Sequence, residues 1–272
     1  MASINSYRNK WLRWHKSYEK RAYKELKKTF SKWNNAIDFD AMTESNYERI
    51  IQNAISEPQM LKDLENIYIE VGLTHGTRVG AGVNKELKLF TLGEFTTVFL
   101  NSIIDYLLEY GAEKVVSISR TYKDDIAKII SKGLEDQKTM PEIAKELQKM
   151  VNRPGFYRWQ AMRIARTETT AAANRAALEA GAISGFVTNK VWLSSQDKRT
   201  RRTPQDEFDH LDMDEVQVNI EDDFKVPRKD APPQAMAYPG DPRGSAGNVI
   251  NCRCAVAIVP ARDRFGNLIP TT

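Results

Sequence analysis

The chain has 272 residues, of which 41% are hydrophobic and 28% are charged, and its formal net charge is +4 at pH 7. This composition is ordinary for a folded globular protein and excludes wholesale disorder and fibrous designs, and the length suffices for one large domain or two of ordinary size. No apolar run reaches the roughly 18 residues needed to span a bilayer, so we expect no membrane partner.

The positive charge is concentrated at the N-terminus. Residues 1–33 hold ten Lys or Arg against two Asp or Glu, which predicts an anionic partner for this segment. The same segment lacks an apolar core and cleavage site of a signal peptide. Cys252 and Cys254 stand two positions apart, roughly 7 Å along an extended chain, too far for a disulfide. We therefore expect synthesis in a reducing cytoplasm.

From Tyr7 to Ile37, apolar residues recur at steps of three and four, which predicts one long amphipathic helix. Its apolar face is aromatic, with Tyr7, Trp11, Trp14, Tyr18, Phe30 and Trp33. Its flanks are basic, with Arg8, Lys10, Arg13, Lys16, Lys20, Arg21, Lys24, Lys27 and Lys28. Two interpretations are open. The helix docks on the body of the protein with a solvated basic side, or it contacts DNA or an acidic protein surface, because aromatic and basic residues together serve base stacking and phosphate contact.

Further helix signals follow as far as residue 151. They are a capping box at Ser45 and Glu48, a first-turn Pro58, an amphipathic run from Leu92 to Tyr110 ended by Gly111, a helix over 112–137, and a capping box from Thr139 to Glu142 that opens a helix over 143–151. The glycines at 72, 76 and 80 are four apart, which predicts either close packing of a neighbouring element or a loop. The N-terminal half therefore reads as all-helical.

The pattern changes in the C-terminal half. A long Ala-rich helix is predicted from Tyr157 to Ala180, closed by Gly181, and strands are predicted over 186–193, 215–220 and 252–259. The expected fold class is α+β, with an N-terminal all-helical region followed by a small α+β domain that has a long helix and several short antiparallel strands. The expected divisions are 1–150, 151–260 and a short tail, 261–272.

The segment from Tyr238 to Cys254 is the most distinctive of the chain, because it combines two Pro, three Gly, an Asp, two Asn and both cysteines in a turn-rich stretch. The metal-ligand set that it offers is Cys252 and Cys254 together with His210. Zinc favours such nitrogen and sulfur ligands, and an Asp such as Asp206 or Asp241 could complete the set. Two interpretations stay open, a structural zinc ion or two packed free thiols.

Catalytic motifs are scarce. The histidines at 15, 75 and 210 stand in unrelated contexts, and no nucleophile elbow or zinc-protease helix occurs, so we expect no enzyme activity. A faint order of Arg166, Ser194 with Ser195, and Glu207 is similar to that of ADP-ribosyltransferases. Because buried charges need partners, we expect the helix segment 166–168 to bind the polar loop 197–201.

Seven segments follow one another in a specific order. They are Met140 to Leu147, Ile164 to Glu168 followed by Asn174 to Ala177, Trp192 with Asp197 to Arg201, His210 to Asp214, Phe224, Tyr238 to Pro242, and Asn248 to Cys254. Together they resemble the phage Mu F-like head morphogenesis family, the minor head proteins of tailed bacteriophages, over about residues 112–258. That family commonly has Gly where Glu215 stands here, so we expect the turn to be made differently, through Asp212 and Asp214.

The resemblance implies a minor head protein of the virion, at the portal vertex or in the head interior, made in the cytoplasm of the bacterial host. It implies a role in head assembly and in DNA packaging or ejection. The implied partners are the portal protein and capsid or scaffold proteins, with packaged double-stranded DNA reached through the basic N-terminal helix. The alternatives are a phage-encoded enzyme, similar to an ADP-ribosyltransferase or a zinc hydrolase, and a free DNA-binding protein.

Overall fold

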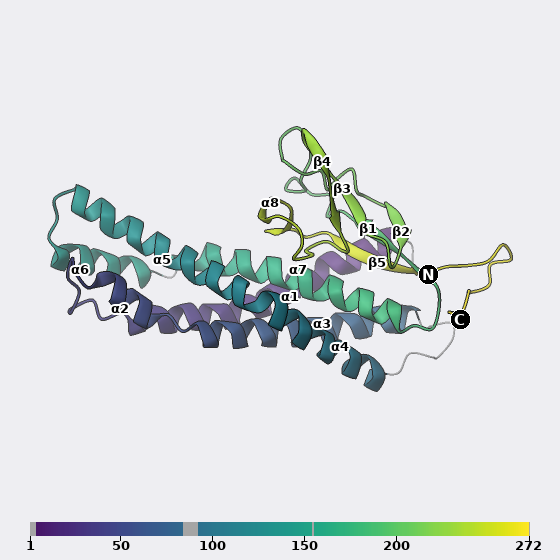
Figure 1. Cartoon of the computed structure of the whole chain (residues 1–272), viewed down its shortest axis with the longest axis horizontal. Helices are drawn as coiled ribbons and strands as arrows, with labels where there is room; N and C mark the ends of the chain where they lie inside the picture. Colours follow the sequence, from purple (N-terminus) through teal and green to yellow (C-terminus); the bar gives the residue numbers. More distant parts are fainter. Residues whose placement is uncertain (1–3, 84–91, 154, 272) are drawn as a thin grey trace. The chain divides into compact units, whose positions relative to one another are not determined.

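The computed structural model describes residues 4–83, 92–153 and 155–271 (Figure 1). The first positions of the predicted 1–150 region and the last position of the predicted tail lie outside these described residues. The helices are α1 (Ile4–Ala36), α2 (Tyr47–Ala54), α3 (Glu57–Val83), α4 (Leu92–Tyr106), the π-helical turn η2 (Leu107–Gly111), α5 (Ala112–Glu135), α6 (Met140–Val151), α7 (Arg158–Ala182) and α8 (Ala246–Val249). The strands are β1 (Thr188–Leu193), β2 (Gln217–Asn219), β3 (Phe224–Arg228), β4 (Ala231–Met236) and β5 (Ala255–Pro260). The long helices precede the short antiparallel strands along the chain, which confirms the predicted α+β class.

The residues group into two compact units. Unit 1 comprises residues 1–22, 66–105 and 163–272, and unit 2 comprises residues 23–65 and 106–162. Helices α1, α3, α4 and α7 therefore contribute residues to both units. The predicted domain boundary at about residue 150 divides the chain by sequence position, and it stays a prediction. The two compact units divide the chain differently, since each combines segments from both sides of that residue.

Unit 2 is helical and has an aromatic core. The Phe30 ring lies 5.2 Å from that of Trp33, 5.6 Å from that of Tyr122 and 5.9 Å from that of Tyr157. The predicted capping box at α6 is confirmed, since the Thr139 backbone N–H donates to the Glu142 carboxylate over 2.8 Å. Two sequence patterns thus predict parts of this unit, namely the helical spacing of its aromatic residues and the capping box at the start of α6.

Two predicted helix ends in unit 2 are wrong. Gly111 does not end a helix, because its φ of −64° and ψ of −43° are helical and α5 follows directly. An added Cβ there would lie 3.0 Å from Leu61 Cδ1, so Gly111 serves packing. The capping residue of α2 is Asn46, one position after the predicted Ser45. The Asn46 side chain accepts from the Thr43 backbone N–H over 2.7 Å, which forms the turn that precedes the helix.

Unit 1 contains the sheet, whose order is β2, β1, β5 with both pairs antiparallel. In Figure 1 these strands lie together. A second hairpin, β3 with β4, escaped prediction because β4 carries Pro232 and Pro233, which lack an N–H group. The two prolines lie where the register of the β3 and β4 pair shifts between Val226 and Arg228, so neither proline is a regular paired residue of the ladder.

The close packing predicted for the glycines holds at Gly72 and Gly76. An added Cβ would lie 1.9 Å from the Phe99 ring at the first position and 2.0 Å from the Phe95 ring at the second. At Glu215, where the related family commonly has Gly, the backbone has φ of +64°. Glu215 itself therefore adopts the left-handed conformation that glycine favours, and the expectation of a differently made turn stays a prediction.

Candidate functional site

The structure brings the predicted metal-ligand set together in unit 1. The ligand atoms of His210, Cys252 and Cys254 all lie within 4.8 Å of one another. His210 Nδ1 is 3.6 Å from Cys252 Sγ and 3.5 Å from Cys254 Sγ. The three residues are only 1%, 2% and 2% exposed, so the cluster is closed to solvent.

Hydrogen bonds set the tautomer of His210. The Asn248 side-chain NH₂ donates to Gln234 Oε1 over 2.8 Å, which leaves Asn248 Oδ1 to accept from His210 Nε2–H over 2.6 Å. The proton of the neutral ring is therefore on Nε2, and the Nδ1 lone pair faces the two sulfurs. Metal-binding histidines are oriented in the same manner by a second polar group. Asn248 was missed as a site residue, although it stands in the Asn248 to Cys254 motif.

The two thiols share a hydrogen bond. The thiol of Cys254 hydrogen-bonds Cys252, which lowers the pKa of Cys252 well below its ordinary value of 9.0, and the same bond together with burial raises the pKa of Cys254 well above it. The Cys254 backbone N–H also donates to Cys252 Sγ over 3.4 Å. The cluster thus offers two cysteine sulfurs and one imidazole nitrogen, a donor set suited to a soft or borderline metal ion such as zinc.

The expected fourth ligands, Asp206 and Asp241, are wrong. Among the described residues, neither belongs to the metal-ligand group. The Asp206 carboxylate accepts from the Arg202 backbone N–H over 3.0 Å, and Asp241 forms an ion pair of 2.6 Å with Arg243. Both acids therefore stabilise their own loops, and three ligands are found among the residues that the structure describes.

Side chains of α1 and α7 hold the main chain of the Cys-Arg-Cys segment, and these residues were also missed by sequence reasoning. Thr170 Oγ1 donates to the Cys252 carbonyl over 2.7 Å, Trp11 Nε1 donates to the Arg253 carbonyl over 2.8 Å, and Asn174 Nδ2 donates to the Cys254 carbonyl over 3.1 Å. The signal that could have identified two of them is a polar pair four apart, at 170 and 174, inside an Ala-rich run.

The segment 166–168 has a structural role, although its partners differ from those expected. Arg166 Nε donates to Glu19 over 2.7 Å, and its Nη1 donates to Asn251 over 3.0 Å. Glu168 accepts from the Tyr68 hydroxyl over 2.8 Å. The loop 197–201 was the wrong partner for Arg166, because that loop contacts the Cys-Arg-Cys segment instead: Asp197 pairs with Arg253 over 2.6 Å.

The residues that are similar to an ADP-ribosyltransferase set have separate partners. Arg166 pairs with Glu19, and Glu207 pairs with Arg228 over 2.6 Å. Ser194 is buried, and the Ser195 hydroxyl hydrogen-bonds that of Thr200 over 2.9 Å. Across the described ranges, no hydrogen bond or ion pair joins these residues into one constellation.

The aromatic face of α1 is buried. Trp11 and Tyr18 in unit 1 are 1% and 0% exposed, and Phe30 and Trp33 in unit 2 are each 1% exposed, so none of these rings can stack on nucleic-acid bases. Arg8 is also buried and pairs with Asp214 over 2.9 Å. Docking therefore explains the aromatic face, and the stacking part of the DNA interpretation is wrong for these four rings. Exposed basic residues remain along the helix: Arg13, Lys16, Lys20, Lys24 and Lys27.

Comparison with known proteins identifies one family and one curated relative. Residues 124–257 match the family described as Phage Mu protein F like protein. The chain is 30% identical over 140 residues to a protein of Enterococcus faecalis named NAD(+)--arginine ADP-ribosyltransferase EFV. That alignment covers 49% of this chain and 26% of the relative, so the chain spans about a quarter of the relative's length. No solved structure matches the chain.

Within the described residues, no helix combines the length and the apolar character needed to cross a membrane. The family is structural and supports a general assignment as a bacteriophage head protein, present in the virion and interacting with other virion proteins. Over residues 124–257, this chain belongs to the family of phage Mu protein F like proteins.

Proposed function

We propose that the protein is a minor head protein of a tailed bacteriophage, located at the portal vertex or in the head interior. In this role it acts in head assembly and in DNA packaging or ejection, with the portal protein and capsid or scaffold proteins as partners. The observation that carries the proposal is the family match over residues 124–257. The buried Cys-Arg-Cys segment, whose carbonyls accept hydrogen bonds from Thr170 and Trp11, supports a binding protein, because both of its thiols are buried.

The exposed basic residues of α1 support contact with packaged DNA. Arg13, Lys16, Lys20, Lys24 and Lys27 recur at steps of three and four, which places them on one side of a helix. In the absence of base stacking, such a row would bind phosphates without sequence preference. A variant with Lys16, Lys20 and Lys24 replaced by Gln tests this role, and the logarithmic salt slope of DNA binding should fall by roughly 3. An unchanged slope would remove DNA from the partners.

We also propose that His210, Cys252 and Cys254 hold a structural zinc ion. The burial of the cluster supports a structural ion over a hydrolase, because three ligands leave one metal position open but substrate could not reach it from solvent. Metal analysis of protein purified in a non-chelating buffer should give about one equivalent of zinc. Less than roughly a tenth of an equivalent would leave packed free thiols as the explanation.

Mass spectrometry of purified particles tests the virion role directly. The expected result is the intact chain in procapsids and mature heads, at a copy number far below that of the major capsid protein. Quantification against the portal protein sharpens the assignment, because a portal-vertex protein should be present at a fixed ratio to it. Absence from both kinds of particle would refute the proposal and favour a free DNA-binding protein.

A second candidate is an ADP-ribosyltransferase activity, which the name of the Enterococcus faecalis relative favours. The short coverage of that relative and the separate partners of Arg166 and Glu207 speak against it. A nicotinamide-release assay decides the matter. Turnover that Glu207→Ala abolishes and Glu221→Ala leaves unchanged would establish the enzyme, whereas no turnover is expected here.

A further inference from the structure

Unit 1 contains a groove at the outer edge of its sheet, separate from the His and Cys cluster. One hollow of about 510 Å³ lies between the start of α1, the end of α3 and β5. A second hollow of about 400 Å³ continues from it over the end of β5, since both are lined by Val259, Pro260 and Arg262. We call the two together the β5 groove.

The groove is apolar with a cationic rim. Tyr7, Trp14, Val79 and Val83 supply much of the apolar wall. Lys10, Arg78 and Arg262 also line the larger hollow, and among the residues that the structure describes no Asp or Glu does. The Arg78 guanidinium is held in place, because it donates to the Tyr18 hydroxyl over 2.6 Å and lies 5.0 Å from the centre of the Trp14 ring. A ligand that complements this surface combines apolar side chains with negative charge.

The main chain of β5 presents an open edge to the groove. The Val256 N–H donates to Asn174 Oδ1, and the Val256 carbonyl accepts from the Tyr7 hydroxyl, so both groups point away from β1. Backbone groups alternate in direction along an antiparallel strand, so those of Ile258 point the same way. Within the described residues, no partner is found for them. Pro260 has no N–H, which limits pairing at this edge to Ile258.

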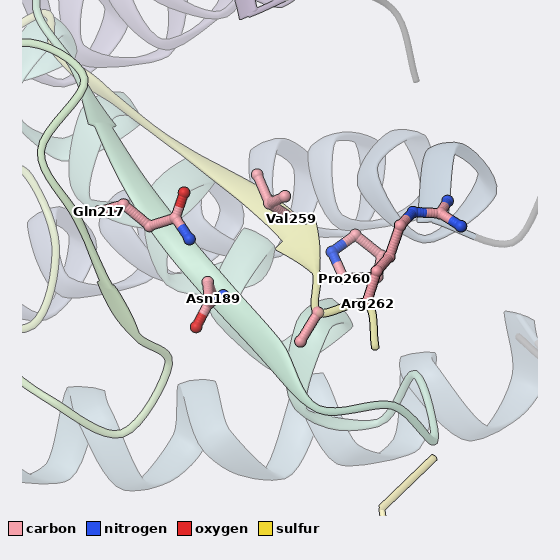
Figure 2. A pocket seen from close by; sticks show the side chains of 6 residues that line it. Asn189, Gln217, Val259, Pro260 and Arg262 are labelled. Carbon is pink, nitrogen blue, oxygen red and sulfur yellow. The ribbon is translucent and has the colours of Figure 1, made fainter. Parts of the chain in front are cut away.

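The second hollow carries two unpaired carboxamides. Figure 2 shows the side chains of Asn189 and Gln217 on neighbouring strands beside the end of β5, with Arg262 beyond Pro260. In the part of the chain that the structure describes, neither carboxamide has a hydrogen-bond partner. Each offers one acceptor and two donors, which matches the peptide groups of an extended chain.

We propose that the β5 groove binds an extended, acidic and apolar segment of a partner protein, which pairs with the Ile258 edge. Alternate side chains of the segment pack on the apolar wall, and its carboxylates form ion pairs with the cations of the rim. Its peptide groups form hydrogen bonds with the two carboxamides. The proposal names a surface and a ligand chemistry, and it does not depend on the chain acting in phage heads.

Fluorescence anisotropy with the full-length chain tests the proposal. The probes are two fluorescein-labelled hexapeptides, Glu-Val-Glu-Ile-Glu-Val and Lys-Val-Lys-Ile-Lys-Val. The acidic probe should bind at least about tenfold more tightly than the basic one, since like charges at the rim disfavour the latter. Equal affinity of the two probes, or binding of neither, would overturn the proposal.

A matched pair of variants locates the binding. Lys10→Glu should weaken binding of the acidic probe by about tenfold or more, whereas Lys32→Glu makes the same charge change on an exposed part of α1 outside the groove and should leave it within about twofold. Equal losses in both variants would reduce the effect to net charge and refute the site. An acidic probe that is N-methylated at alternate residues should also lose binding. Undiminished binding of that probe would refute strand pairing.

Discussion

Units 1 and 2 bury different kinds of side chain. The core of unit 2 is mainly aromatic and aliphatic, with Phe30, Trp33, Ile126, Ile130 and Leu147 each no more than 1% exposed. Unit 1 buries titratable and polar groups to the same degree, among them His75, Lys190, His210 and Asn174. Unit 2 also contains buried hydrogen bonds, such as the one that Asn34 donates to the Val151 carbonyl, whereas unit 1 in addition buries histidine and lysine side chains whose hydrogen bonds depend on their protonation states. The two units should respond differently to metal, acid and core truncation.

Metal removal should produce the largest difference between the units. If zinc binds the His and Cys cluster, its apparent binding free energy is on the order of 10 kcal/mol, as in small zinc domains, and that stabilisation is lost with the ion. Hydrogen exchange measured before and after treatment with a strong chelator should show faster exchange in unit 1 and unchanged exchange at Ile126 and Ile130. His210→Ala should reproduce the effect, and His75→Gln serves as the buried-histidine control. Uniform loss of protection in both units would contradict this contrast.

Truncation of the aromatic core should have the next largest effect, on unit 2. Phe30→Ala removes a ring that packs on three others, and we expect a loss of about 3–5 kcal/mol in the free energy of unfolding. The loss should be the same at pH 7 and pH 5. Denaturant titration at both values measures it. A loss that changes with pH would show that titratable groups contribute to this core as well.

Acid should destabilise unit 1 through His75. Its Nδ1 lies 3.3 Å from the Tyr18 hydroxyl and its Nε2 lies 3.3 Å from the Tyr7 hydroxyl. Because Arg78 donates to Tyr18 and Tyr7 donates to the Val256 carbonyl, a neutral ring satisfies all of these groups. Burial, and then the charge of Arg78, lower the pKa of His75 from its ordinary 6.5 to about 3.

The sign of the pH effect follows from that lowered pKa. As pH falls below 6.5 the unfolded chain binds a proton that folded His75 does not, so stability is complete above that value and falls toward pH 3. His75 should contribute a loss of roughly 2 kcal/mol at pH 5, and His15, whose pKa burial also lowers to about 3, adds to the total. Denaturant titrations between pH 7 and pH 5 measure it, with His75→Gln compared at each pH. If the variant shows the same pH slope, another group is responsible.

The smallest expected effect concerns the start of α6. Thr139→Ala removes the threonine hydroxyl of the capping box, and caps of this kind contribute about 1 kcal/mol. Hydrogen exchange should increase mainly in α6, with little change in unit 1. Exchange that increases equally throughout the chain would show that the two units unfold together.

The sequence predicted best those elements whose determining residues lie close together along the chain. The period of α1 and the capping box of α6 are encoded by neighbouring residues, so the sequence suffices for both. The β3 and β4 hairpin was missed because its prolines obscure the strand pattern, and the continuation through Gly111 was missed because packing on Leu61 decides it. For the site, the ligand types indicated His210, Cys252 and Cys254. The roles of Trp11 and Asn248 depend on contacts between distant segments, which no local pattern encodes.

The hydrogen bond from Trp11 to the Arg253 carbonyl has a practical consequence for deletion experiments. Together with Tyr7, which binds the Val256 carbonyl, it makes the first turns of the chain a structural part of its last strand. Removal of residues 1–37 would leave main-chain groups of the Cys-Arg-Cys segment unsatisfied. A truncated protein that fails to enter heads or to retain DNA would therefore report misfolding as readily as a lost contact. Single-charge substitutions on the exposed side of α1 separate the two causes.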